Sequence, residues 1–189
     1  MKNKGFSLVE LIIIISIMTI IAVAIAPALI RYINKSRKAD DLTAADTIKS
    51  AYNAALANED IYEVVAKKSE DTNMKLGSDS VTALLVASAD DDEWTIYGSS
   101  SDDLKIFKEE MDKTCPPEKL KFRKNIDPSD SKNSNTDYLI GGTDEFTPDG
   151  WLVCMNQAEE PCVFVTNGKK NSDIHGVSLS PLKCSAYKE

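Results

Sequence analysis

The sequence has few of the residues from which catalytic sites are usually built. Its 189 residues include one histidine, His175, which we expect to be a solvated loop residue in the polar stretch 171–176. No glycine-rich phosphate loop, HExxH or CxxC sequence is present. The acidic stretches 90–93 and 127–137 lack the ligand spacing and central glycine of an EF-hand. We therefore expect no enzyme activity, no cofactor and no metal site.

Charged residues are also missing from residues 11–30, which are almost entirely apolar. Twenty helical residues span about 30 Å, the thickness of the hydrocarbon layer of a bilayer. This stretch therefore predicts a membrane helix. Directly before it stands Glu10, and a carboxylate costs about 2.5–3.5 kcal/mol at the centre of a membrane helix and less near an interface. We infer that Glu10 has a functional role that requires a cation as its partner.

The residues around Glu10 carry a specific resemblance. Residues 5–10, Gly-Phe-Ser-Leu-Val-Glu, with the apolar run behind them, resemble the class III signal of type IV pilins and type II secretion pseudopilins. The resemblance implies that a prepilin peptidase cuts between Gly5 and Phe6 and methylates the new amine of Phe6. It also implies that Glu10 acts in filament assembly and that the leader starts in the cytoplasm.

Simple electrostatics agrees with this assignment. A Phe6 amine and the Glu10 carboxylate are one helical turn apart, so they can pair within one chain or between two copies. We favour pairing between copies, because it explains why the leader is removed. An ordinary secretory signal, cut near the alanines at 22–26, and a plain membrane anchor are the alternatives. Neither explains both Gly5 and Glu10.

Pro27 interrupts the long apolar run. It removes a backbone hydrogen bond and predicts a kink. The resemblance implies that a matching proline borders a segment that unwinds in the filament. However, this chain has no glycine between Phe6 and Pro27, and alanine retains helix better than glycine does. A simple kink and a local unwinding are therefore both open.

Beyond Pro27 the pattern becomes amphipathic. Apolar residues recur at steps of three or four up to Leu56, and charged residues such as Asp40, Asp41 and Lys49 fall between them. We predict one near-continuous helix from Phe6 to about Asn58, with its second half packed under a head.

The remainder predicts that head. Residues 58–80 read as a helix end and a loop, 81–87 as a buried helix turn or two, and Leu104, Phe107 and Met111 as one face of a short helix. The strand candidates are residues 94–97, 120–123, 138–140, 151–154, 162–165 and 177–179. The fold class is therefore α+β: a long N-terminal helix packed against an antiparallel, pilin-like sheet of three to five strands.

The patterns, together with the leader cleavage and filament core that the resemblance implies, predict four segments. They are a leader (1–5), a transmembrane and filament-core helix (6–30), the amphipathic second half of the helix (31–58) and a soluble head with variable loops (59–189).

The part of the chain after the apolar run is acidic and contains all of the cysteines. Residues 1–49 carry seven Lys/Arg and four Asp/Glu, whereas residues 50–189 carry 15 and 26, a net charge of −11. This acidity disfavours nucleic acid as a partner. The four cysteines, Cys115, Cys154, Cys162 and Cys184, all follow the apolar run, and an even number in an exported domain favours disulfides. Their pairing is open, and buried free thiols are the alternative.

The resemblance implies a structural subunit of a type IV pilus-like surface filament, used for adhesion, twitching motility or surface colonisation. Such a subunit is located in the inner (cytoplasmic) membrane before assembly and becomes part of an extracellular filament afterwards. The implied partners are further copies of itself, other pilins, the prepilin peptidase, the pilus assembly platform and the membrane. The alternatives are a pseudopilin of type II secretion, a minor pilin of DNA uptake, and a membrane-anchored binding domain that never polymerises.

Overall fold

The structure is a computed structural model. It describes residues 7–68, 74–76, 79–98, 103–118, 121–122, 126, 139–141, 144–170, 173–180 and 187. The chain divides into two compact units, residues 1–37 and residues 38–189, and each is considered separately below.

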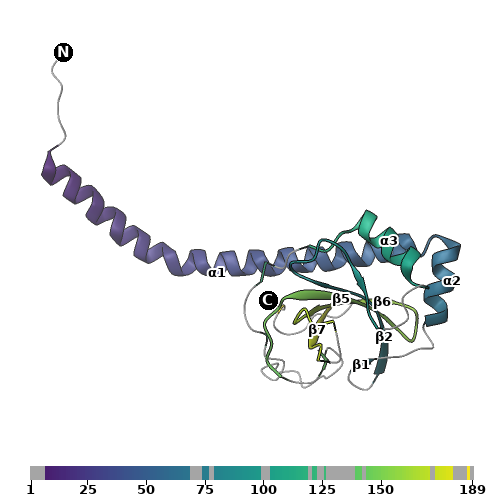
Figure 1. Ribbon diagram of the computed structural model, residues 1–189. Helices are drawn as coiled ribbons and strands as arrows, with labels where there is room; N and C mark the ends of the chain where they lie inside the picture. The colour runs from purple at the N-terminus through teal and green to yellow at the C-terminus, as the bar shows by residue number, and fades with distance from the viewer. Residues whose placement is uncertain are drawn as a thin grey trace, which may run out of the picture. The chain divides into compact units, whose positions relative to one another are not determined.

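The longest element is α1 (Leu8–Ala55), a helix of 48 residues (Figure 1). Its length follows from the sequence, which has no glycine in this range and many alanines. The helix ends in a short turn, in which the amides of Ala57 and Asn58 donate to carbonyls three residues back. Asn58 then caps α2 (Glu59–Lys68), because its Oδ1 accepts the amide of Asp60 at 3.0 Å. The predicted long helix is confirmed, but α2 lies where a loop was expected.

The second unit is built on an antiparallel sheet (Figure 1). Its seven strands among the described residues are β1 (Met74–Leu76), β2 (Asp79–Ser88), β3 (Thr95–Ile96), β4 (Leu139–Ile140), β5 (Gly150–Asn156), β6 (Pro161–Thr166) and β7 (Gly176–Ser180). The strand order is β1-β2-β5-β6-β7-β4, with β3 paired to β2. The α+β class is confirmed, and the sheet is larger than the three to five strands expected.

One predicted helix is wrong. Residues 81–87 belong to the strand β2, which pairs with β5 along most of its length. Every residue from Val81 to Ala87 is buried, because both faces of this central strand are covered. A short run that is apolar throughout has no period that distinguishes a strand from a buried helix, and the pairing with β5 decides between them.

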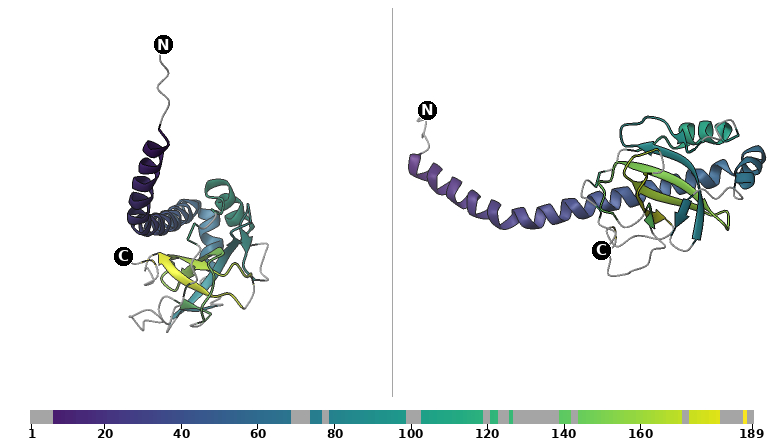
Figure 2. Two further views of the ribbon diagram at one scale, coloured as in Figure 1. Left: turned by 90° about the vertical axis from the view of Figure 1, so that its left-hand side faces the viewer. Right: turned by 60° about the horizontal axis from the view of Figure 1, so that its bottom comes forward.

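Apolar side chains are buried on both faces of the sheet. On one face, alternate residues of β5 and β6, such as Trp151, Val153 and Val163, join the core formed with the helices. The second half of α1 contributes Ala44, Ala45, Ile48, Ala51, Tyr52 and Ala55 to this core. The intervening strand residues form a second cluster on the other face, around Leu152 and Phe164. Figure 2 gives two further views of the sheet and of α3 (Lys105–Thr114), whose Phe107 and Met111 lie in the first core.

Candidate functional site: the N-terminal helix and its cap

The four residues predicted to act in processing and assembly lie near the N-terminus. Gly5 and Phe6 are outside the residues that the structure describes. Glu10 and Pro27 both lie within α1. The geometry that bears on the predicted site therefore begins at Ser7.

Ser7 and Glu10 form the N-terminal cap of α1. The first helical hydrogen bond runs from the amide of Leu11 to the carbonyl of Ser7 at 3.2 Å. The Glu10 carboxylate accepts a hydrogen bond from the Ser7 amide at 2.9 Å. This is the return half of a capping box, in which the acid at the third helical position satisfies an amide that the helix leaves unpaired. The partner of Glu10 in the structure is thus within its own chain, one peptide bond from Phe6.

The first unit exposes its apolar side chains. Every large apolar residue given below is at least 40% exposed. These residues are Leu8, Val9, Leu11, Ile12, Ile13, Ile14, Ile15, Ile17, Met18, Ile20, Ile21, Val23, Ile25, Leu29, Ile30, Tyr32 and Ile33. By length and composition, α1 is the one helix among the described residues that is suited to cross a membrane. The exposed apolar surface of α1 is expected to contact lipid or other helices, because exposing so large an apolar area to water is unfavourable.

The two hydroxyl residues of this apolar stretch are satisfied within the helix. Ser16 donates to the carbonyl of Ile12 and Thr19 to that of Ile15, both at 2.7 Å. An unpaired hydroxyl costs free energy in hydrocarbon, and these bonds avoid that cost. Ser16 and Thr19 are therefore compatible with an apolar surrounding.

Pro27 lies inside α1, and the helix continues on both sides of it. Figure 2 shows that the first half of α1 curves. A proline removes one hydrogen bond of the helix and is a recognised cause of bending. Unwinding of this segment in a filament stays a prediction.

Within the second unit, a buried carboxylate on α1 binds residues from later parts of the chain. Asp41 is 2% exposed, although the sequence placed it among the charged residues between the apolar positions. Its oxygens accept hydrogen bonds from the amides of Lys121 (3.0 Å) and Phe122 (3.1 Å) and from the hydroxyl of Tyr187 (3.3 Å). Burial raises the pKa of Asp41, and these three hydrogen bonds oppose that effect. The spacing from Asp41 to Ala45 and Ile48 was the available signal that Asp41 lies on the buried stripe.

The contacts of Asp41 continue into an aromatic cluster. Phe122 and Tyr187 meet edge to face, with ring centroids 5.2 Å apart. The ammonium of Lys38 lies 5.3 Å from the centre of the Phe122 ring, a cation–π distance. Tyr187 near the C-terminus is thereby joined to the first residues of the second unit.

The cysteines whose placement is described are free thiols: Cys115, Cys154 and Cys162. Cys154 and Cys162 are cross-strand partners in β5 and β6, on the sheet face away from α1. Burial raises the pKa of both, that of Cys162 to about 11. Cys115 lies in the core on the other face, and Cys184 is outside the described residues. The predicted disulfides stay a prediction.

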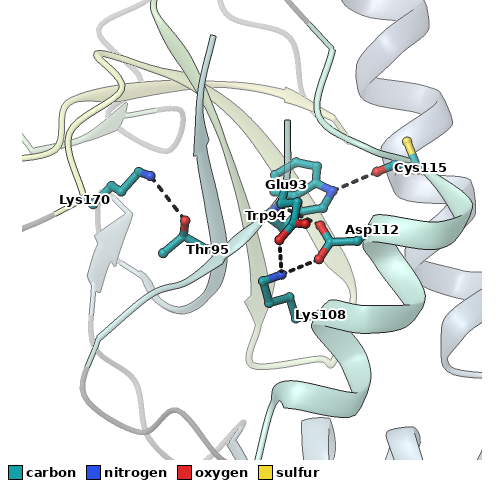
Figure 3. A network of polar contacts seen from close by, with 7 residues as sticks. All are labelled: Glu93, Trp94, Thr95, Lys108, Asp112, Cys115 and Lys170. Carbon is teal, nitrogen blue, oxygen red and sulfur yellow. Dashed lines mark hydrogen bonds and ion pairs between the residues drawn. The ribbon is translucent and has the colours of Figure 1, made fainter. Parts of the chain in front are cut away.

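A polar network surrounds Trp94 at the N-terminal side of β3 (Figure 3). The Trp94 amide donates to Asp112 at 2.6 Å, and its indole Nε1 donates to the carbonyl of Cys115 at 2.7 Å. Lys108 pairs with both Asp112 and Glu93, and the hydrogen bond to Asp112 is the main cause of its raised pKa. The network fixes α3 against the sheet.

An open hollow of about 600 Å³ lies beside this network, lined by residues 91–96 and Lys108. Its charged groups are largely engaged, since Asp91 pairs with Lys170 at 2.8 Å and Glu93 with Lys108 at 3.2 Å. Across the described ranges, no group of three or more His, Cys, Asp and Glu residues is placed to hold a metal ion. His175 is half-buried rather than fully solvated, and its Nδ1 has no hydrogen-bond partner among the residues whose placement is described.

Comparison with known proteins supports the N-terminal assignment. A family model described as the prokaryotic N-terminal methylation motif matches residues 1–26. Neither the characterised proteins nor the solved structures gave a match. The matched range contains Gly5, Phe6, Glu10 and most of the exposed apolar surface. The chain thus carries, at residues 1–26, the N-terminal methylation motif that is the class III signal of type IV pilins and pseudopilins.

Proposed function

We propose that this chain is a structural subunit, a pilin, of a type IV pilus-like surface filament. One observation carries the proposal: the methylation motif stands directly before a helix that exposes its large apolar side chains. A peptidase cuts after Gly5, Phe6 becomes the methylated N-terminus, and copies associate through residues 6–30. The amphipathic residues 31–58 and the head at 59–189 lie outside that core, and the chain is not an enzyme.

Glu10 has a defined role in this proposal. Before cleavage its carboxylate is satisfied by the Ser7 amide of its own chain. Cleavage creates an amine on Phe6, and Glu10 of one copy then pairs with Phe6 of another. An acid in a low-dielectric core without a cation is strongly disfavoured, so this pairing sets the axial register of the helices.

Three partners follow from the proposal besides other copies and other pilins. The prepilin peptidase processes the chain, the inner membrane stores it, and the assembly platform extracts it into the filament. Adhesion, twitching motility and surface colonisation are uses of such a filament. A pseudopilin of type II secretion shares the same processing, as does a minor pilin of DNA uptake, which the acidity of residues 50–189 disfavours.

The test compares two variants of Glu10 that differ in whether they retain the hydrogen bond to the Ser7 amide. Glutamine at this position retains the hydrogen bond to the Ser7 amide but has no charge, whereas alanine loses both. We expect both Glu10→Gln and Glu10→Ala to insert into the membrane. We expect their amount in sheared filaments to fall at least about tenfold below that of the wild type, which corresponds to a loss of about 1.4 kcal/mol in the free energy of assembly. Full assembly of Glu10→Gln would show that Glu10 acts as a cap and not as a charge.

Two further measurements separate the alternatives. Mass spectrometry of native material is expected to find a methylated Phe6 at the N-terminus. A mature N-terminus at Met1, on single molecules that stay in the membrane, would favour the non-polymerising anchored domain. Surface filaments labelled with antibody against the head would favour the pilin over the secretion pseudopilin.

A further inference from the structure

The first unit ends in cations that no acid of that unit opposes. Arg31 and Arg37 are exposed, and the sequence has no Asp or Glu between residues 11 and 39. Neither arginine forms an ion pair with any residue that the structure describes. With the leader in the cytoplasm, these cations follow the membrane span on the far side, against the usual preference for positive charge inside. Such an arrangement calls for an anionic partner.

The second unit carries a matching surface on α2. Glu59, Tyr62 and Glu63 are exposed, and their spacing places them on one face of the helix. The Tyr62 hydroxyl donates to Glu159 at 3.2 Å, which brings the turn between β5 and β6 beside α2. We call this set the α2 acidic surface; its members are Glu59, Tyr62, Glu63, Glu159 and Glu160.

The carboxylates of the α2 acidic surface lie close enough to repel one another. Glu59 and Glu63 are four residues apart, and like charges at that spacing weaken a helix. By comparison, Asp91 of the head pairs with Lys170 at 2.8 Å and Asp103 with Lys68 at 3.8 Å. The carboxylates of the α2 acidic surface have no ion pair among the described residues. A cationic partner from outside the chain would relieve their mutual repulsion.

We propose that Arg31 and Arg37 of one copy bind the α2 acidic surface of a second copy. The inference rests on the proposed filament, since it requires copies packed side by side. The chemistry favours arginine, because a guanidinium pairs with a carboxylate through two hydrogen bonds and stacks on an aromatic face. Tyr62 is 46% exposed and offers that face between the carboxylates. The contact joins the base of one helix to the head of another copy and adds to the packing of the apolar helices.

Charge reversal tests the contact in the full-length chain. We expect Arg31→Glu with Arg37→Glu, and separately Glu63→Lys with Glu159→Lys, each to reduce the filament fraction by about fivefold or more. Combining all four reversals in one chain restores opposite charges at the contact and is expected to recover most of the filament. The matched control, Asp92→Lys with Glu109→Lys, reverses two exposed acids outside the α2 acidic surface and should leave assembly unchanged.

Several outcomes would overturn the proposal. One is an unchanged filament fraction after either pair of reversals; another is a loss that the fourfold variant does not recover. If the arginine variants insert poorly into the membrane, co-expressed Arg37→Cys and Glu63→Cys chains give an independent readout. A disulfide between them in filaments supports the contact, and its absence, or equal crosslinking of a Glu109→Cys control, overturns it.

The same experiments distinguish this contact from lipid binding and from a failure of assembly as such. If the arginines instead bind lipid phosphates, Arg31→Glu with Arg37→Glu will lower binding to vesicles that contain phosphatidylglycerol, with no recovery of filaments in the fourfold variant. That result would overturn the proposal. A wild-type chain that forms no filaments would instead contradict the proposed function itself.

Discussion

The two halves of α1 use apolar residues in opposite ways. In the first half, large apolar side chains occur all around the helix, and all of them are at least 40% exposed. In the second half a single stripe is apolar, and it is buried in the core of the head, with Ile48 at 1% and Tyr52 at 0% exposure. The second half therefore has its partner in the same chain, whereas the first half depends on lipid or other copies. One continuous helix thus serves two different surroundings.

The largest expected effect comes from the buried stripe. Replacing Ile48 with alanine leaves a cavity in the core, and we expect the free energy of unfolding of the head to fall by about 2–5 kcal/mol. Ile14→Ala, in the exposed half, is the matched control and should leave that free energy unchanged. Equilibrium denaturation in detergent, followed by tryptophan fluorescence, measures both. Equal losses for the two variants would contradict the division of α1 into two surroundings.

A lysine in the exposed half gives the next largest effect. We expect Ile17→Lys to disfavour membrane insertion by about 2.5–3.5 kcal/mol, because a charge at the centre of a membrane helix is costly. Thr47→Lys is the control, since Thr47 is exposed in the second half and its hydroxyl bonds only within α1. The fraction of chain that resists alkaline extraction from membranes is the measurement. If Ile17→Lys remained fully inserted, the first half would not be a membrane span.

Asp41 gives a smaller effect that depends on pH. Asp41→Ala leaves the amides of Lys121 and Phe122 without their acceptor and should cost about 1–3 kcal/mol. Since burial raises the pKa of Asp41, the folded state binds its proton more tightly than the unfolded state does. The contribution of Asp41 is therefore complete below the ordinary pKa of 3.8 and declines as pH rises through the folded value.

The loss caused by Asp41→Ala should accordingly be larger near pH 3 than near pH 7 when unfolding is measured at both. A loss that grows toward neutral pH would show that the three hydrogen bonds outweigh burial and lower the pKa instead.

The smallest effect concerns Cys154 and Cys162. Both thiols are buried, and a pKa of about 11 for Cys162 leaves little thiolate at pH 8. We expect iodoacetamide to label them slowly in the folded chain and quickly after unfolding, as measured by intact mass. Fast labelling of the folded chain would contradict their burial. Failure to label the unfolded, unreduced chain would instead reveal the disulfide.

The sequence predicts the parts of this fold that have a clear period. The long helix, the face of α3 with Phe107 and Met111, and the alternating strand β7 follow from spacing. The strands β5 and β6 are apolar throughout, and they are predicted because turn residues bound them on both sides. The sequence does not predict β2, because the apolar run 81–87 shows no alternation and its residues include alanines and leucines, which also suit a buried helix. It also misses α2, whose ten residues include only four apolar side chains besides tyrosine.

The candidate site shows the same limit. Glu10 is recognisable because a single acid beside an apolar run is costly unless it has a role. The bond from the Ser7 amide to that acid requires the three-dimensional structure. Asp41 was placed on the polar side because charged residues are seldom fully buried. Its amide donors come from residues about 80 positions later, which no local pattern indicates.

The bond between Asp41 and Tyr187 has a mechanical consequence. It connects two residues 146 positions apart, one near the start of the second unit and one near its end. Tension applied along α1 would therefore act on Tyr187 through Asp41 as well as on the residues that follow α1. In a filament under tension, this bond would oppose separation of residues near the C-terminus from α1.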